Sequence, residues 1–285
     1  MEGYQHSTSQ FNSSKDDFPL FYQQWTPNTS AERVIVFQHG LGEHSGRYQN
    51  LVQAFSGTAT AFYGMDARGH GRTDGKRGHV DRFQLFVSDL CDLIKRVRQE
   101  NDGQKVFLLG HSMGGAIVLK YAITGNYQDN LRGLIASSPA IRPTMDWVKK
   151  LQKPVAALLA RLTPSLTLSN QLNINDLSHH KPVVMSYHND PLVHGRTSAC
   201  LGHALFNIHR DILSRADSLH IPVYLMHGTA DRLTSADATQ HFYNLLTTPD
   251  KTLKLYEGLY HETMNERPED RARVLDDLKN WVLSH

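Results

Sequence analysis

The stretch KVFLLGHSMGGAIVLKYA, residues 105–122, constrains the fold of this chain more than any other. A short apolar run, residues 106–109, ends in Gly-His-Ser-Met-Gly-Gly, and a helical run follows at once. An apolar run closed by glycine indicates a buried strand, and a helix that starts directly after it has to turn back over the sheet. The stretch therefore predicts a strand–turn–helix unit, which is typical of a parallel sheet covered by helices.

The same alternation of strand and helix recurs along the chain. Two strands at residues 2–11 and 19–25 are expected to form a hairpin through residues 12–15. The later strands are predicted at 33–40, 59–66, 106–110, 131–139, 221–228 and 251–258, and the helices at 46–56, 80–101, 116–123, 238–246 and 271–285. The fold class is therefore α/β, with a mostly parallel central sheet flanked by helices.

The alternation is interrupted after Pro139. Residues 142–217 contain helical pieces and no clear buried strand. We therefore expect a core of residues 1–141 and 218–285, with a helical cap of residues 142–217 inserted in it. In that insert, the apolar run 154–162 follows the lysine-bearing segment 147–153. The two could form a lid that contacts membranes or micelles, or a cap helix that packs on the core.

Composition limits the class of protein. The 285 residues are 40% hydrophobic and 20% charged, as in an ordinary globular protein with a sizeable core. Thirty basic and 28 acidic residues leave a net charge of +2, which argues against a nucleic-acid partner. Two cysteines cannot form a disulfide framework, and neither a signal-peptide pattern nor an 18-residue apolar run is visible. These features predict a cytoplasmic enzyme.

GHSMG, residues 110–114, matches the G-x-S-x-G pattern in the strand–turn–helix context that this motif requires. A turn this sharp holds its serine in a strained backbone conformation, and Gly110 and Gly114 leave room for the neighbouring strand and helix. The turn lifts the hydroxyl above the sheet edge, next to the free N–H groups of the helix N-terminus. Ser112 is therefore the candidate nucleophile.

A serine nucleophile needs a base, and the base needs a carboxylate to orient it. In this architecture both follow later strands, in the order Ser, Asp or Glu, His. Asp231 comes just after the strand at 221–228, and His261 comes just after the strand at 251–258. Asp231 and His261 are the favoured pair, with two rival acids and one rival base in the same regions: Asp237, Glu262 and His227.

An oxyanion hole would complete the site. One donor is expected to be the backbone N–H of Met113, the residue after the candidate nucleophile. The second is expected from the loop after the strand at 33–40, where Leu41 stands between two glycines that let its N–H turn toward the site.

The 17 histidines do not form a metal motif. The segment HETMN, residues 261–265, fails the H-E-x-x-H pattern because its last residue is Asn265. The pairs His179-His180 and His203/His209 lack a carboxylate or thiolate set at ligand spacing. We therefore expect no metal.

Five segments together resemble the monoacylglycerol lipase and lysophospholipase group of α/β-hydrolases, over residues 20 to 283. They are HGLGEHSGRY (39–48), MDARGHGRTDG (65–75), GHSMGG (110–115), HGTADRLTS (227–235) and LYEGLYHE (255–262). The motif GHSMGG alone occurs in many α/β-hydrolases, whereas the first and last segments in combination are much more specific.

The resemblance implies an α/β-hydrolase fold with Ser112, Asp231 and His261 as the triad and with Leu41 and Met113 as oxyanion donors. It also implies a cap over a narrow acyl channel, and single-chain acyl lipids (monoacylglycerol or lysophospholipid) as the substrates, cleaved without metal or cofactor. General carboxylesterase, peptidase and perhydrolase activities on the same triad stay open, as does a non-catalytic binding module. An apolar cap without an acidic cluster favours a lipid over a peptide.

Overall fold

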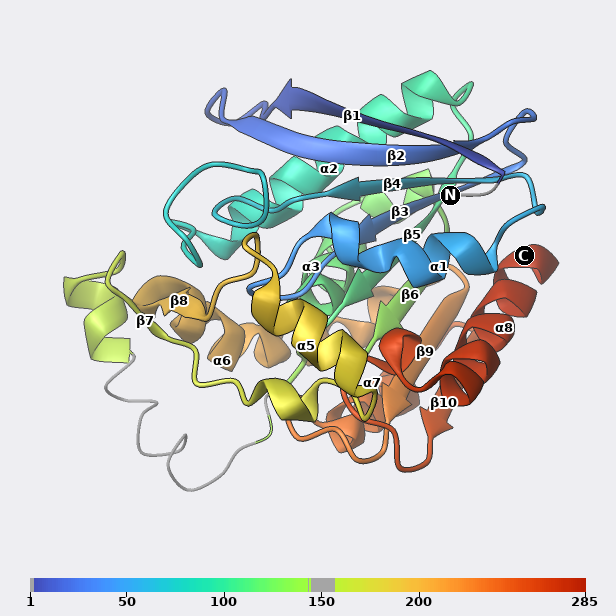
Figure 1. Cartoon of the computed structure of the whole chain (residues 1–285). Helices are drawn as coiled ribbons and strands as arrows, with labels where there is room; N and C mark the ends of the chain where they lie inside the picture. The colour runs from blue at the N-terminus through green and yellow to red at the C-terminus, as the bar shows by residue number, and fades with distance from the viewer. Residues whose placement is uncertain (1–2, 143, 145–156) are drawn as a thin grey trace.

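The centre of the molecule is an eight-stranded sheet in the order β1-β2-β4-β3-β5-β6-β9-β10 (Figure 1). The computed structural model describes residues 3–142, 144 and 157–285. The strands of the sheet are β1 (Tyr4–Asn12), β2 (Pro19–Pro27), β3 (Arg33–Gln38), β4 (Thr60–Met65), β5 (Val106–His111), β6 (Leu131–Ser137), β9 (Val223–Gly228) and β10 (Lys251–Tyr256). The pairs β1/β2 and β2/β4 are antiparallel and all other neighbours are parallel, so the predicted hairpin and mostly parallel sheet are confirmed.

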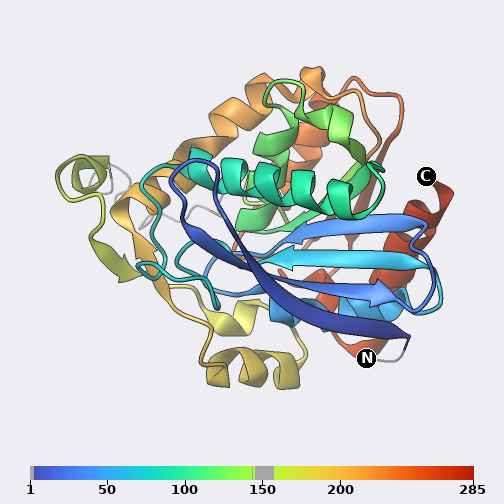
Figure 2. The ribbon, with the colours of Figure 1, turned by 90° about the horizontal axis from the view of Figure 1, so that it is seen from above.

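Helices cover both faces of the sheet (Figure 2). One face carries α1 (Gln49–Ala54) and α8 (Pro268–Ser284), and the other carries α2 (Phe83–Glu100), α3 (Met113–Ala122) and α7 (Ala236–Leu245). Because both faces are covered, every residue of β4, β5 and β9 is buried. This explains why these strands read as continuous apolar runs rather than as alternating ones.

The helix predicted at 46–56 is divided in the structure. A 3-10 turn at Ser45–Tyr48 precedes α1, and the His44 ring accepts the N–H of Gly46 at the start of that turn. Both the backbone N–H and the hydroxyl of Ser45 donate to Asp66 Oδ1, at 2.8 and 2.5 Å. These contacts to a residue just after β4 hold the first turn away from regular α-helical geometry.

The segment between β6 and β9 adds no strand to the main sheet in its described residues. It contains a helical stretch at 157–162, α5 (Lys181–Asn189) and α6 (Ala199–Ser214), together with a two-stranded antiparallel sheet of β7 (Thr167–Ser169) and β8 (Arg196–Ser198). In Figure 1 these elements lie at the carboxyl ends of the parallel strands.

The small β7–β8 sheet was not expected from the sequence. Each strand has three residues and most of them are partly or fully exposed, so neither shows an apolar pattern that could predict it. Segment 147–153 and the first three residues of 154–162 lie outside the described residues. The cap boundaries at 142 and 217 stay a prediction. Among the described helices, none has the length and apolarity needed to cross a bilayer.

Candidate active site

Ser112 stands at the turn between β5 and α3 in a strained conformation, with φ +55° and ψ −119°. Positive φ is uncommon for a residue with a side chain and persists only where the surroundings hold it. Here the Ser112 N–H donates to the Ser137 carbonyl at 3.0 Å, and the Ser112 carbonyl accepts from Ala116 and Ala140 at 3.1 and 2.8 Å. The backbone of β6, of the loop after it and of α3 therefore fixes this turn.

No side chain fits at either of the two glycines of the motif, Gly110 and Gly114. A Cβ atom on Gly110 would lie 2.3 Å from the Gly114 carbonyl oxygen, and one on Gly114 would lie 2.2 Å from the Gln38 carbonyl oxygen. Both obstacles are backbone atoms, which cannot turn aside as a side chain can. These close approaches let α3 begin directly after β5 with the serine at the corner.

We expect Gly114→Ala to destabilise the fold by about 1–3 kcal/mol, because the added methyl group has to displace the backbone of β3. Thermal unfolding followed by circular dichroism measures this. The matched control is Gly202→Ala within α6, where the nearest atom to an added Cβ is 3.6 Å away. That variant should unfold at the wild-type temperature or above it, because alanine favours a helix over glycine. Equal stability of the two variants would contradict the steric role of Gly114.

Asp231 and His261 lie in direct contact. Asp231 follows β9, His261 follows β10, and His261 Nδ1 is 2.6 Å from Asp231 Oδ2. The other carboxylate oxygen, Oδ1, accepts the backbone N–H groups of Leu233 at 2.7 Å and Thr234 at 3.0 Å. The short loop after β9 therefore wraps around the carboxylate and points it at the imidazole.

The surroundings shift the pKa values of Asp231 and His261 in opposite directions. Burial raises the pKa of Asp231, but the charge of His261 and hydrogen bonds from His227 and His261 outweigh burial and hold that pKa well below its usual range. Burial lowers the pKa of His261, but Asp231, with smaller contributions from Glu262 and Glu43, outweighs burial and raises it above the ordinary value. The carboxylate therefore stays ionised and the imidazole is a stronger base than a free histidine.

The rival acids and base, Asp237, Glu262 and His227, have other positions or other partners in the structure. Asp237 is exposed in the first turn of α7. Glu262 forms a bidentate ion pair with Arg47. His227 is buried in β9, and its Nε2 lies 3.0 Å from Asp231 Oδ2.

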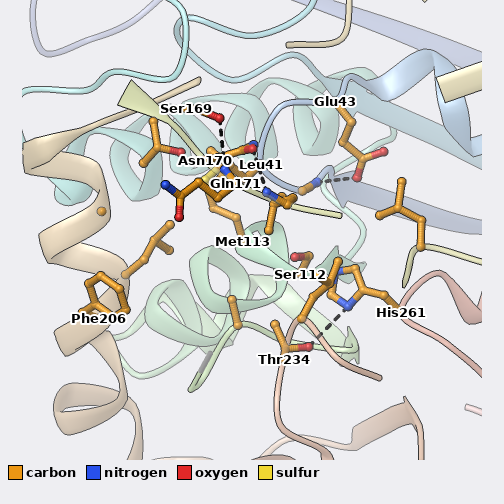
Figure 3. Close-up of a pocket in the computed structure, with 18 of the residues that line it drawn as sticks. Leu41, Glu43, Ser112, Met113, Ser169, Asn170, Gln171, Phe206, Thr234 and His261 are labelled. Carbon is orange, nitrogen blue, oxygen red and sulfur yellow. Dashed lines mark hydrogen bonds between the residues drawn. The ribbon is translucent and has the colours of Figure 1, made fainter. Parts of the chain in front are cut away.

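Ser112 and His261 meet in one cavity of about 540 Å³ (Figure 3). Leu41 and Met113 line the same cavity. Met113 is the first residue of α3, so its N–H is one of the four that no carbonyl within the helix accepts. Next to Leu41, Gly42 adopts φ +79°, a conformation that glycine tolerates and most residues do not. All five residues predicted for the triad and the oxyanion hole thus lie in or directly behind one cavity.

The opposite wall of the cavity comes from the segment between β6 and β9. Its apolar lining includes Leu159, Leu168, Leu172, Leu177, Leu205 and Phe206. The segment is tied to the core nearby, because the N–H of His194 donates to the Gly42 carbonyl at 2.9 Å and that of Ser198 donates to the Gly78 carbonyl at 2.8 Å.

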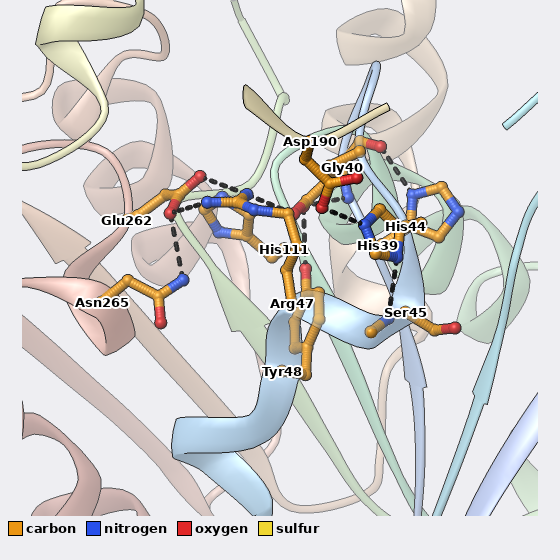
Figure 4. A network of polar contacts seen from close by, with 12 residues as sticks. His39, Gly40, His44, Ser45, Arg47, Tyr48, His111, Asp190, Glu262 and Asn265 are labelled. Carbon is orange, nitrogen blue, oxygen red and sulfur yellow. Dashed lines mark hydrogen bonds and ion pairs between the residues drawn. The ribbon is translucent and has the colours of Figure 1, made fainter. Parts of the chain in front are cut away.

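A buried ion cluster lies beside the cavity and was not identified from the sequence (Figure 4). Arg47 contacts Glu43 at 2.6 Å and both carboxylate oxygens of Glu262 at 2.7 and 2.8 Å. Glu43 also accepts the backbone N–H of Gly40 at 2.7 Å. Burial raises the pKa of Glu43, but Arg47 and two nearby histidines lower it to about 2. The guanidinium thus joins the loop after β3 to the residue that follows His261.

Part of this cluster, the pair Glu43 and Arg47, could have been recognised from the sequence. Glu43 and Arg47 stand four residues apart within HGLGEHSGRY, where two opposite charges follow a buried strand. Their partner Glu262 is 215 residues from Arg47, and local spacing cannot reveal such a pairing. Among the residues that the structure describes, no group of three His, Cys, Asp or Glu side chains is arranged to hold a metal ion.

The sheet order, the strained serine between β5 and α3, and the Asp–His pair beyond β9 and β10 are the features of an α/β-hydrolase. A family model described as "Serine aminopeptidase, S33" matches residues 29–268. The chain is 36% identical to the monoacylglycerol lipase of Mycolicibacterium smegmatis, over 93% of each chain. It is 33% identical to the human monoglyceride lipase, over 92% of this chain and 86% of the relative.

Solved structures of two similar lipases superpose on this chain. The crystal structure of the Paleococcus ferrophilus monoacylglycerol lipase superposes with a TM-score of 0.83 at 33% identity and covers 99% of both chains. The Saccharomyces cerevisiae monoglyceride lipase, solved with a substrate analogue, superposes with a TM-score of 0.88 over 98% of this chain and 94% of that one. The two sequences are 24% identical, and the superposition shows that they share the fold. The chain belongs to the monoacylglycerol lipase group of the α/β-hydrolases and is a carboxylic ester hydrolase.

Proposed function

We propose that this enzyme hydrolyses esters of single-chain lipids, with monoacylglycerol as the leading substrate, through an acyl-enzyme on Ser112. The observation that carries the proposal is the composition of one cavity. Its floor holds Ser112 and His261, and its opposite wall is built from apolar side chains. An acyl chain can lie against that wall while its ester carbonyl meets the serine. The relatives named above act on the same class of ester, according to their names.

In this proposal Ser112 attacks the ester carbonyl while Nε2 of His261 takes the hydroxyl proton. Asp231 holds the Nδ1 proton of His261 through the 2.6 Å contact and stabilises the imidazolium that forms. The backbone N–H groups of Leu41 and Met113 stabilise the oxyanion of the tetrahedral intermediate. His261 then returns the proton to the departing alcohol, and a water molecule, deprotonated by the same imidazole, hydrolyses the acyl-enzyme.

Peptidase activity is the alternative that the description of the family model favours. The sequence predicted no acidic cluster for the amino group of a peptide, but two carboxylates, Glu43 and Glu262, do line the cavity. Both are bound to Arg47. A peptide ammonium would have to compete with that buried guanidinium, so we favour ester over peptide hydrolysis.

We expect kcat/KM to rise with acyl length from acetyl to decanoyl monoacylglycerol by at least about a hundredfold. Each methylene buried against the apolar wall contributes about 0.8 kcal/mol, which is roughly a fourfold gain before saturation. Initial rates with a series of monoacylglycerols below their micellar concentrations measure this. Equal rates across the series would contradict the lipid assignment. Faster cleavage of aminoacyl anilides than of any ester would favour the peptidase alternative.

We propose further that residues 142–217 act as a cap that contacts a lipid surface during substrate uptake. Leu158 and Leu162 are 57% and 67% exposed, and a spacing of four residues places them on one side of the helical stretch 157–162. Leu166 and Leu168 are also exposed, and Leu168 lines the cavity as well. The exposed apolar residues therefore continue to the cavity wall, as an entry route for a lipid requires.

We expect a variant with Leu158→Ser and Leu162→Ser to bind phosphatidylcholine vesicles roughly tenfold more weakly than the wild type. Losing two exposed leucine side chains removes apolar area that is available for insertion, while Leu166 and Leu168 are kept. Co-sedimentation with vesicles measures the binding. The matched control is Leu255→Ser on β10, whose side chain is 42% exposed. Equal binding by all three proteins would show that the cap makes no such contact.

A further inference from the structure

Asp231 binds a second histidine in addition to His261. His227 Nε2 lies 3.0 Å from Asp231 Oδ2, the oxygen that His261 Nδ1 contacts at 2.6 Å. The Thr234 hydroxyl lies 2.9 Å from the same oxygen. The side chains of Asp231 and His227 are both withdrawn from water. Three polar groups therefore share one carboxylate oxygen, and only one of them is the expected base.

His227 is itself held in place. It is the last residue but one of β9, and its Nδ1 lies 2.8 Å from the Thr239 hydroxyl on α7. An ionised carboxylate only accepts hydrogen bonds, so Nε2 of His227 carries the proton in its contact with Asp231. In the neutral ring, Nδ1 then accepts the proton of the Thr239 hydroxyl. A chain of hydrogen bonds thus runs from Thr239 through His227 to Asp231, where it meets the bond from His261.

We propose that His227 is a positioning residue for ester hydrolysis: it orients the Asp231 carboxylate and takes up part of its negative charge, which limits how strongly Asp231 holds a proton on His261. This inference rests on the function proposed above. His227 is not among the described residues that line the cavity, so it acts through Asp231 and not on the substrate.

Other charged groups also face His261. They are the carboxylates of Asp231, Glu262 and Glu43, and Arg47 pairs with both glutamates. The titratable ring of His111 also faces His261, with 4.7 Å between the two ring centroids, and burial lowers its pKa to about 4. None of them contacts His227 directly except Asp231. Replacing His227 therefore changes the titration of His261 by way of Asp231 and leaves the other groups in place.

The test compares the pH dependence of kcat/KM for a soluble short-chain ester in the wild type, His227→Leu and His227→Gln. The base has to be neutral, and the pKa of His261 is raised above 6.5, so wild-type activity should fall as the pH drops through a value above 6.5. In His227→Leu, Asp231 loses a donor and stabilises the imidazolium more strongly. The acidic limb should then move upward by about half to one pH unit.

The same variant should lose roughly tenfold in kcat at the pH plateau, because the carboxylate is less firmly placed. The His227→Gln variant puts an amide N–H close to the position of Nε2 and should restore the wild-type limb and most of the rate. Thr239→Val removes the hydroxyl that holds Nδ1. This variant should move the acidic limb of the kcat/KM profile upward by less than His227→Leu does. It also tests the inference if His227→Leu does not fold.

Three results would overturn the inference. One is an unchanged acidic limb in folded His227→Leu, or in Thr239→Val if the leucine variant does not fold. Another is a limb that moves to lower pH. The third is a His227→Gln variant that behaves like His227→Leu, since a residue needed only to fill space would be replaced better by leucine than by glutamine. Failure of the wild type to hydrolyse any ester would instead overturn the proposed function.

Discussion

Replacing Ser112 by alanine is expected to lower kcat for ester hydrolysis by about a millionfold, which is the size of the loss when a triad serine is removed. The alanine methyl group cannot attack a carbonyl, so neither the acyl-enzyme nor a covalent phosphonate adduct can form. A fluorophosphonate probe should therefore label the wild type at one site and leave Ser112→Ala unlabelled. Mass spectrometry of the labelled peptide and initial rates with a monoacylglycerol measure the two effects.

Ser9→Ala is a suitable control, because Ser9 is exposed on β1. This control variant should keep both labelling and activity. Thermal unfolding of Ser112→Ala should resemble that of the wild type, because the backbone bonds of residue 112 to Ser137, Ala116 and Ala140 do not involve its side chain. Labelling of Ser112→Ala at another residue, or hydrolysis within tenfold of the wild type, would contradict Ser112 as the nucleophile.

Replacing Arg47 by methionine is expected to destabilise the protein by about 3–5 kcal/mol at pH 7. Methionine fills much of the same space but leaves the buried carboxylates of Glu43 and Glu262 without their cation. It also removes the contact of the guanidinium with the Tyr187 ring of α5, whose centroid lies 4.6 Å away. Denaturant unfolding of the wild type and the variant measures the difference in the free energy of unfolding.

The expected pH dependence of this effect has a definite sign. In the wild type, Glu43 has a folded pKa of about 2 against an ordinary value of 4.5, so its contribution to stability is present above pH 4.5 and is lost as the pH falls toward 2. In Arg47→Met the unpaired carboxylates are destabilising while ionised, and protonation relieves them. The difference between the two proteins should therefore shrink as the pH is lowered from 7 to below 4.5.

A variant with Glu43→Gln, Arg47→Met and Glu262→Gln tests whether unpaired charge is the cause. It leaves no buried charge without a partner, so it should recover much of the stability lost in Arg47→Met. If the triple variant is no more stable than Arg47→Met, lost packing rather than charge explains the effect.

The sequence by itself determined the alternation of strands and helices and the corner at Ser112. These features depend on residues close together in the chain. The apolar run 106–109 predicts a strand because β5 is buried on both faces, and Gly110 is needed because a Cβ there would meet the Gly114 carbonyl oxygen four residues along the chain. The ends of β9 and β10 also predicted that Asp231 and His261 would approach each other, because the carboxyl ends of parallel strands meet at one edge of a sheet. Their catalytic roles stay a prediction until the variants are measured.

The tertiary structure decided which polar groups share a partner. The sequence favoured His261 over His227 as the partner of Asp231, and in the structure Asp231 contacts both histidines. Arg47 reaches Glu262 across 215 residues, and the short β7–β8 sheet forms between segments that show no strand pattern of their own. Such pairings depend on distances that exist only after the sheet has brought its loops together. The sequence shows which side chains are able to interact, and the tertiary structure shows which of them are close enough to do so.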